Sequence, residues 1–336
     1  MISSILSLSL PSGLYMKYTK RLILFIFAFL CVFSQIYATK LPAQMQETFE
    51  LQNNLLEQPK YVLAALKKAY PEIISHYSYH AKEKDWVVFT FDNQKYYWAK
   101  GRLLPQKKRH YCQKYKAYVF YYYPETFIHP ESYPKKYIEK LSSVNFKKER
   151  LVPIDYEYSF FNSLYGGSTR KQIEQNIESM YFLGYKINVH KNVVQSLKRI
   201  EKEILKLNKT DQETIYFLKT LRSVFGYNWR LIGDTQRKSN HCWGTAIDIL
   251  PKNWKKKKIY WMWERSFNKD WFMVPKKSRW CPPDSIVQIF ENEGFIWGGK
   301  WDLWDNMHFE YRPELLTLQD EYQTFINSKN NFSIQQ

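Results

Sequence analysis

The sequence lacks the features that define several large classes of protein. It holds only 11 glycines among 336 residues, which excludes collagen-like and glycine-repeat folds. No stretch reaches the roughly 20 apolar residues that a membrane-spanning helix needs, so a multi-pass membrane protein is excluded. No two cysteines have Cys-x-x-Cys spacing, which argues against a cysteine zinc site. Hydrophobic residues make up 45% and charged residues 24%, and this balance excludes an intrinsically disordered chain.

Negative charge is scarce, and the formal net charge is +18 at pH 7. Such a charge attracts anionic polymers, but it does not say which ones. The lysines are scattered, and no helix-turn-helix, zinc-finger or RNA-recognition signature accompanies them, so we expect no nucleic acid partner. An anionic cell-wall polymer fits the charge as well, and the lysine run 255–258 would attract it.

The first 38 residues have the layout of a secretory signal peptide. A basic segment (17–21) precedes an apolar run (22–33), and Ala38 offers a small residue before a cleavage site. Met16 would then be the true start. We therefore predict a secreted or periplasmic protein with no stable membrane span in the mature chain. A leader that is kept as a single-helix anchor is the alternative.

Behind the leader, local patterns divide the chain into three parts. Residues 39–150 predict a small α+β domain, residues 151–184 a connecting segment, and residues 185–325 a catalytic domain. Alternating and helical apolar periodicities set the expected elements. We expect helices at 41–68, 169–180, 193–207, 210–224 and 284–294, and strands at 86–91, 95–98, 117–123, 186–190, 229–232, 246–250 and 307–311. His76 and His80, four residues apart, would lie on a surface helix.

Two segments concentrate the residue types of a metal centre. The first runs from Ser239 to Asp248 and the second from Asp305 to Glu310. A catalytic zinc needs three protein ligands and one open position, and His241, Asp248 and His308 meet that need. Asp248 lies in an alternating apolar strand, where an ionised carboxylate is costly unless it is paired or metal-bound.

Two more carboxylates flank the second histidine. Asp305 stands three residues before His308, so both can face the metal. There Asp305 would take a proton from a zinc-activated water and pass it to the leaving amine. Glu310 lies two residues after His308 on the same strand face, where it would orient an imidazole N–H. Glu310 as the base is the competing assignment.

At these residues the sequence resembles peptidase family M15, the zinc D,D-carboxypeptidases and L-alanyl-D-glutamate endopeptidases. The pattern Ser-x-His-x-x-Gly-x-Ala-x-Asp, followed by a carboxylate-x-x-His, carries the resemblance, and residues 294–301 resemble the endopeptidase branch. The resemblance implies Zn²⁺ as cofactor and stem peptides of peptidoglycan as substrate. It implies zinc ligands at His241, Asp248 and His308, catalytic residues at Asp305 and Arg230 (with Arg237 as the alternative to Arg230), and substrate contacts at Ser239 and Trp301.

The implied architecture is an α+β domain in which helices flank a small antiparallel sheet that carries the zinc. Cys242 and Trp243 depart from the family pattern, and a lysine- and tryptophan-rich insert fills residues 251–283. These departures leave the cleaved bond open between the carboxypeptidase and endopeptidase types. A disulfide between Cys242 and Cys281 also stays open, since it needs Cα atoms within about 7 Å.

Two other classes of function remain as alternatives. The chain could be an inactive wall-binding module that keeps a structural zinc, although its full set of ligands and its base argue against this. It could also be a basic nucleic-acid binder, in which case its retention on DNA would be salt-sensitive and independent of zinc.

Overall fold

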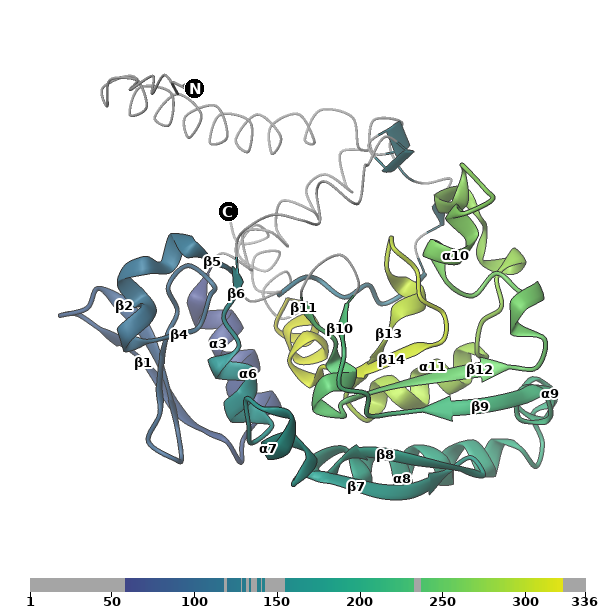
Figure 1. Cartoon of the computed structure of the whole chain (residues 1–336), viewed down its shortest axis with the longest axis horizontal. Coiled ribbons are helices and arrows are strands. Elements are labelled where there is room, and N and C mark those ends of the chain that lie inside the picture. The colour runs from purple at the N-terminus through teal and green to yellow at the C-terminus, as the bar shows by residue number, and fades with distance from the viewer. Residues whose placement is uncertain are drawn as a thin grey trace, which may run out of the picture. The chain divides into compact units, whose positions relative to one another are not determined.

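The computed structural model describes residues 58–117, 120–127, 129–130, 133, 138–139, 141–142, 155–232 and 237–322 (Figure 1). The predicted leader and most of the predicted helix at 41–68 lie outside these residues. Residues 54–336 form one compact unit. Among the residues described, no helix is long and apolar enough to cross a membrane.

The N-terminal part is a helix packed against a four-stranded antiparallel meander. The strands follow one another in the sheet in chain order, and the hairpin predicted around residue 93 is confirmed. A 3-10 helix and a short strand follow. The elements are α3 (Pro59–Ala69), β1 (Ile74–His80), β2 (Asp85–Thr90), β3 (Lys95–Tyr97), β4 (Leu104–Pro105), η1 (Gln106–Lys114) and β5 (Tyr115–Lys116).

Two predictions in this part are wrong. His76 and His80 lie on strand β1 rather than on a helix, because β1 pairs with β2 and the His76 ring stacks on Phe89 at 4.3 Å. Residues 117 and 120–123, predicted as a strand, lie outside the sheets. Their aromatic rings pack on separate neighbours instead; Phe120, for example, stacks on Trp98.

A connecting region leads into the second part. Thr169 and Gln172 form a reciprocal capping box that starts α7. The helix predicted to reach residue 180 ends at Glu174, because the next residues pair as a hairpin. The predicted boundary after residue 184 falls in the turn of this hairpin. The elements are β6 (Asp155–Tyr156), α6 (Ser159–Leu164), α7 (Arg170–Glu174), β7 (Ile177–Phe182) and β8 (Tyr185–His190).

A second four-stranded antiparallel sheet, in the order β13-β14-β12-β9, carries the motif residues. The predicted fold class, α+β with a small antiparallel sheet flanked by helices, is confirmed. Its main elements, seen in Figure 1, are α8 (Lys191–Leu207), α9 (Gln212–Thr220), β9 (Leu221–Phe225), β12 (Ala246–Pro251), α11 (Asp284–Asn292), β13 (Phe295–Trp297) and β14 (His308–Tyr311). Shorter elements are β10 (Leu231–Ile232), β11 (Arg237–Lys238), η4 (Asn240–Trp243), η5 (Trp254–Lys256), α10 (Trp261–Arg265), η6 (Trp271–Met273), η7 (Lys276–Ser278) and η8 (Gly298–Lys300).

The two faces of this sheet have opposite characters. Ile247, Ile249 and Phe309 join α8 and α11 in the main apolar core. Successive strand residues point to opposite faces. Asp248, His308 and Glu310 therefore emerge on the face away from that core. The alternation that builds the core also gathers the polar residues of the site.

Candidate metal centre

The pairing of β12 with β14 brings two predicted ligands together. Asp248 is the cross-strand partner of His308, and Ala246 is the partner of Glu310. The Nδ1 atom of His308 lies 2.9 Å from Oδ1 of Asp248. Sequence positions 60 residues apart thus meet through the register of one strand pair.

The third predicted ligand comes from the 3-10 turn that leads into β12. The Ser239 hydroxyl accepts a hydrogen bond from the backbone N–H of His241 at 3.4 Å. Gly244 ends the turn with φ +71°, and a Cβ there would come within 2.7 Å of the backbone nitrogen of His190. Glycine permits both the left-handed backbone and this close approach. The motif glycine therefore serves to aim His241.

The three side chains converge on one point. The Nε2 atom of His241 lies 3.2 Å from Oδ1 of Asp248. One ligand atom from each of His241, Asp248 and His308 lies within 4.8 Å of the others. All three residues are largely shielded from solvent.

The hydrogen bonds of His241 are consistent with a cation between these groups. Its Nδ1–H donates to the carbonyl of Gly226 at 2.6 Å, which leaves Nε2 as an acceptor. This Nε2 is buried without a hydrogen-bond partner and faces a carboxylate oxygen. Two acceptors facing each other in a buried site repel unless a proton or metal ion lies between them. The donor set suits zinc, which takes imidazole nitrogen and carboxylate oxygen.

Electrostatics agree with a site built for positive charge. Burial alone would raise the pKa of Asp248, but His241 and His308 hold that pKa well below its usual range. Burial would lower the pKa of His308, yet its bonds to Asp248 and Glu310 raise it to about 10. The Asp248 carboxylate therefore stays ionised although it is largely removed from water.

The two further carboxylates have different surroundings. Glu310 Oε2 accepts from His308 Nε2 at 3.1 Å and from the Asn240 amide, and its Oε1 lies 3.4 Å from Arg312 Nη1. Burial would raise the pKa of Glu310, but these partners lower it to about 2. Both oxygens are occupied, so Glu310 is placed to orient His308.

Asp305, by contrast, has an oxygen to spare. Its Oδ1 is buried without a hydrogen-bond partner. Burial raises the pKa of Asp305 to about 7, with Asp248 adding to the rise and His308 and Arg230 opposing it. A carboxyl group with a pKa near neutrality can both accept and return a proton.

The remaining predicted site residues lie around this centre. Arg230 is exposed, and its charge acts on Asp305. Arg237, the alternative, lies on β11, but its side chain is outside the described residues. Ser239 is buried as the cap of the His241 turn. The Trp301 ring lies 5.6 Å from that of His308, and its Nε1–H donates to the Tyr121 hydroxyl.

Three residues around the ligands were not predicted. The carbonyl of Gly226 accepts a hydrogen bond from the imidazole of His241. The side-chain amide of Asn240 donates one to the carboxylate of Glu310. Asn240 sits between two motif residues, which is a usable signal. The Gly226 carbonyl and the Tyr121 hydroxyl leave no such mark in the sequence, because main-chain direction and long-range packing place them.

The three cysteines that the structure describes take no part in a disulfide. Cys112, Cys242 and Cys281 are all free, so the bridge left open between Cys242 and Cys281 is absent. The Cys242 thiol donates to the carbonyl of Arg230, and Cys281 accepts from the Asn306 amide.

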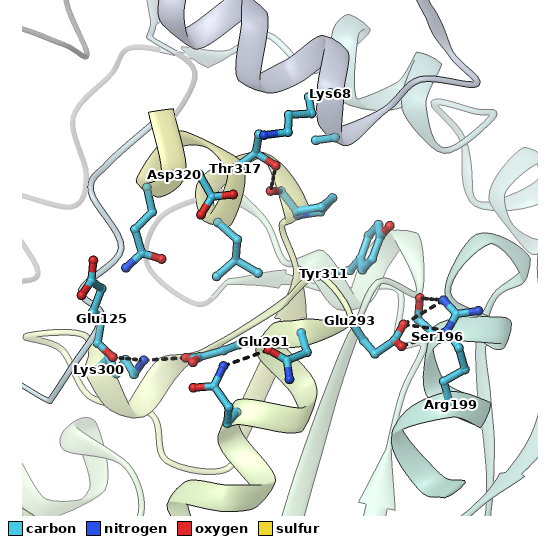
Figure 2. Close-up of a pocket in the computed structure, with 17 residues that line it drawn as sticks. Lys68, Glu125, Ser196, Arg199, Glu291, Glu293, Lys300, Tyr311, Thr317 and Asp320 are labelled. Carbon is cyan, nitrogen blue, oxygen red and sulfur yellow. Dashed lines mark hydrogen bonds and ion pairs between the residues drawn. The ribbon is translucent and has the colours of Figure 1, made fainter. Parts of the chain in front are cut away.

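A pocket of about 690 Å³ lies apart from the metal centre, and none of the three predicted ligands lines it (Figure 2). Its charged walls pair with one another. Lys300 Nζ lies 2.6 Å from Glu291 Oε1, and the Nε and Nη2 atoms of Arg199 both donate hydrogen bonds to the carboxylate of Glu293. Lys68 of α3 and Thr317 both line the pocket, so it lies where the two parts of the unit meet.

A largely shielded His–Asp–His group on an antiparallel sheet, with a spare carboxyl beside it, is an arrangement that could hold a metal ion. Residues 233–311 match a family model described as D-alanyl-D-alanine carboxypeptidase, which confirms the predicted resemblance of this segment to the M15 peptidases. Residues 62–120 match a model for a domain of unknown function. No curated protein and no solved structure shows significant similarity to the chain.

Proposed function

We propose that this protein is a zinc peptidase that hydrolyses a peptide bond in the stem peptide of peptidoglycan. The observation that carries the proposal is the unpartnered Nε2 of His241 facing Asp248 and His308. His241, Asp248 and His308 would hold the ion. A bound zinc supplies a Lewis acid and lowers the pKa of water toward 7.

The chain's own residues would handle the protons. Asp305 accepts the proton of the attacking water on its free carboxylate oxygen and returns it to the departing amine nitrogen. Proton transfer of this kind contributes about 10²- to 10⁴-fold in rate. Arg230 would lie against the negative charge that develops on the scissile carbonyl oxygen. Glu310 holds the His308 ring in orientation throughout.

The substrate proposal rests on the family and on charge. The matched family description names D-alanyl-D-alanine carboxypeptidase, and the motif also resembles L-alanyl-D-glutamate endopeptidases. Both reactions act on stem peptides. A chain with a net charge of +18 would also be drawn to an anionic wall polymer.

A wall substrate requires export. We propose that the protein is secreted or periplasmic, that its leader starts at Met16 and ends near Ala38, and that the mature chain has no stable membrane span. These residues lie outside the described part, so the proposal rests on the sequence pattern alone. Nucleic acid is not among the proposed partners.

The test is digestion of purified sacculi by the zinc-loaded protein, followed by mass spectrometry of the muropeptides. Loss of a terminal D-alanine would identify a carboxypeptidase, and a new D-glutamate amino terminus an endopeptidase. The Asp305→Asn variant serves as the matched control. Bound zinc without any cleavage would contradict the proposal and favour an inactive wall-binding module.

A further inference from the structure

Two chains of contacts run from the N-terminal part of the molecule to the same ligand, His308. One begins at Tyr70, at the end of helix α3, and the other at Tyr121, just beyond the matched domain of unknown function. The first chain ends at Glu310, which is hydrogen-bonded to the imidazole of His308. The second chain ends at Trp301, whose indole ring lies beside that imidazole.

The first chain is ionic and buried. The Tyr70 hydroxyl donates to Oε2 of Glu314 at 2.7 Å. The other oxygen of Glu314 accepts from Nε of Arg312, and Arg312 Nη1 lies 3.4 Å from Oε1 of Glu310. Glu310 then accepts from His308 Nε2. Glu314 is 1% exposed, Arg312 5% and Glu310 8%, so water cannot replace a lost partner.

The second chain is aromatic. The Trp301 indole N–H donates to the Tyr121 hydroxyl at 2.9 Å, and the Trp301 ring lies 5.6 Å from the His308 ring. The residues next to Tyr121 fasten it to both parts of the molecule. Phe120 stacks on Trp98 of the N-terminal part, and the Tyr123 hydroxyl accepts from the backbone N–H of Trp297 at 3.0 Å.

Ring orientation matters at a metal centre. The partner of the second imidazole nitrogen sets the tautomer and the direction of the ligand nitrogen, and losing such a partner typically costs about 10- to 100-fold in metal affinity or activity. Groups further out should cost less: Tyr121 lies one contact beyond Trp301, and Tyr70 lies three contacts beyond Glu310. In this protein that outer layer comes from Tyr70 and Tyr121, more than 180 residues before His308 in the chain.

We propose that Tyr70 and Tyr121 are positioning residues for His308, so that the N-terminal part completes the metal centre of the catalytic part. The proposal rests on the metal site described under the proposed function, but not on its substrate. It gives the N-terminal domain a role: this domain holds one zinc ligand in place.

The experiment compares Tyr70→Phe, Tyr121→Phe and the double variant in the full chain. Each substitution removes one hydroxyl and keeps the ring. Zinc affinity is measured by competition with a chromophoric chelator, and the visible spectrum of the Co²⁺-loaded protein reports ligand geometry. We expect zinc binding weaker by about threefold to tenfold in each single variant, more in the double variant, with a shifted Co²⁺ spectrum.

Tyr181→Phe is the matched control, because Tyr181 is 69% exposed on β7. It should leave both readouts unchanged. Circular dichroism and thermal melts identify any variant that fails to fold. A folded double variant with wild-type zinc affinity and an unaltered Co²⁺ spectrum would overturn the proposal. Because neither readout uses a peptide, a wrong substrate would leave this test intact.

Discussion

In each of the two four-stranded sheets a histidine lies directly across from an aspartate on the neighbouring strand, yet among the described residues only one of these pairs belongs to the candidate metal centre. His80 faces Asp85 across β1 and β2, just as His308 faces Asp248 across β14 and β12. In both cases the sheets are antiparallel. Strand register alone therefore does not create the site.

The difference lies in what else the carboxylate contacts. Asp85 accepts from the backbone N–H of Trp86 at 2.9 Å and of Ala99 at 3.0 Å, so both oxygens serve the main chain. His80 turns to Glu83 instead, at 3.5 Å. Asp248 instead contacts the imidazoles of His241 and His308 and is largely shielded from solvent. A carboxylate becomes a ligand where the backbone does not claim it and burial denies it water.

The sharpest test of this comparison is to neutralise each aspartate. We expect Asp248→Asn to lose bound zinc and at least about 1000-fold in hydrolysis, because a catalytic metal supplies several kcal/mol. Asp85→Asn should keep both and lose only about 1 kcal/mol of stability through weakened backbone hydrogen bonds. Plasma mass spectrometry measures the zinc content of each variant, and urea unfolding measures its stability. Stoichiometric zinc in Asp248→Asn would refute the ligand assignment.

A second test separates the two carboxylates beside His308. Asp305→Asn should retain zinc and lose about 10²- to 10⁴-fold in kcat, because a proton acceptor is removed. Asp302→Asn, three residues earlier, is the control: its carboxylate accepts from Tyr133 instead. Unchanged turnover in Asp305→Asn would remove Asp305 from the mechanism and return the role of base to Glu310.

A smaller effect is expected at Glu310 itself. Glu310→Gln keeps the shape but removes the charge that orients His308, so zinc affinity should fall by about 10- to 100-fold. Chelator competition measures it, and zinc added in excess should restore much of the turnover. Full zinc affinity in this variant would show that Glu310 does not orient the ligand.

The smallest effect concerns a buried histidine without a carboxylate. His190 donates from Nε2 to the Tyr165 carbonyl and accepts at Nδ1 from Asn192, and burial lowers its pKa to about 4. The unfolded state binds the proton more readily, so His190 stabilises the fold above about pH 6.5. That stability is lost as the pH falls from 6.5 toward 4, by up to about 1.4 kcal/mol per pH unit.

Urea unfolding near pH 7.5 and about pH 5 checks the slope for His190, with His190→Asn as the control. Asparagine can still cap α8 but does not titrate in this range. If wild type and variant lose stability equally on acidification, His190 is not the group responsible.

Much of the metal centre could be predicted because its signals are local. Asp248 interrupts an apolar alternation, and Glu310 shares a strand face with His308, so period-two geometry brings each to the polar face of the sheet. The strands at 86–91 and 246–250 and the helix at 193–207 followed from the same periodicities and are confirmed.

The errors arose where local pattern and tertiary contact disagreed. The spacing of His76 and His80 suits a helix face, but β2 was available as a partner. The tyrosines at 121–123 have strong strand propensity, yet each finds its own neighbour in the catalytic part. Intrinsic propensity is weak compared with such packing.

The amino-acid sequence alone determined which side chains can hold a metal and move a proton, because spacing along a strand decides which residues share a face. Only the tertiary structure shows that both oxygens of Glu310 are already bonded while Asp305 has one without a partner, because packing places those partners. It also connected Tyr70 and Tyr121 to His308 through intervening residues, because contacts across so long a stretch of chain depend on how whole sheets and helices pack.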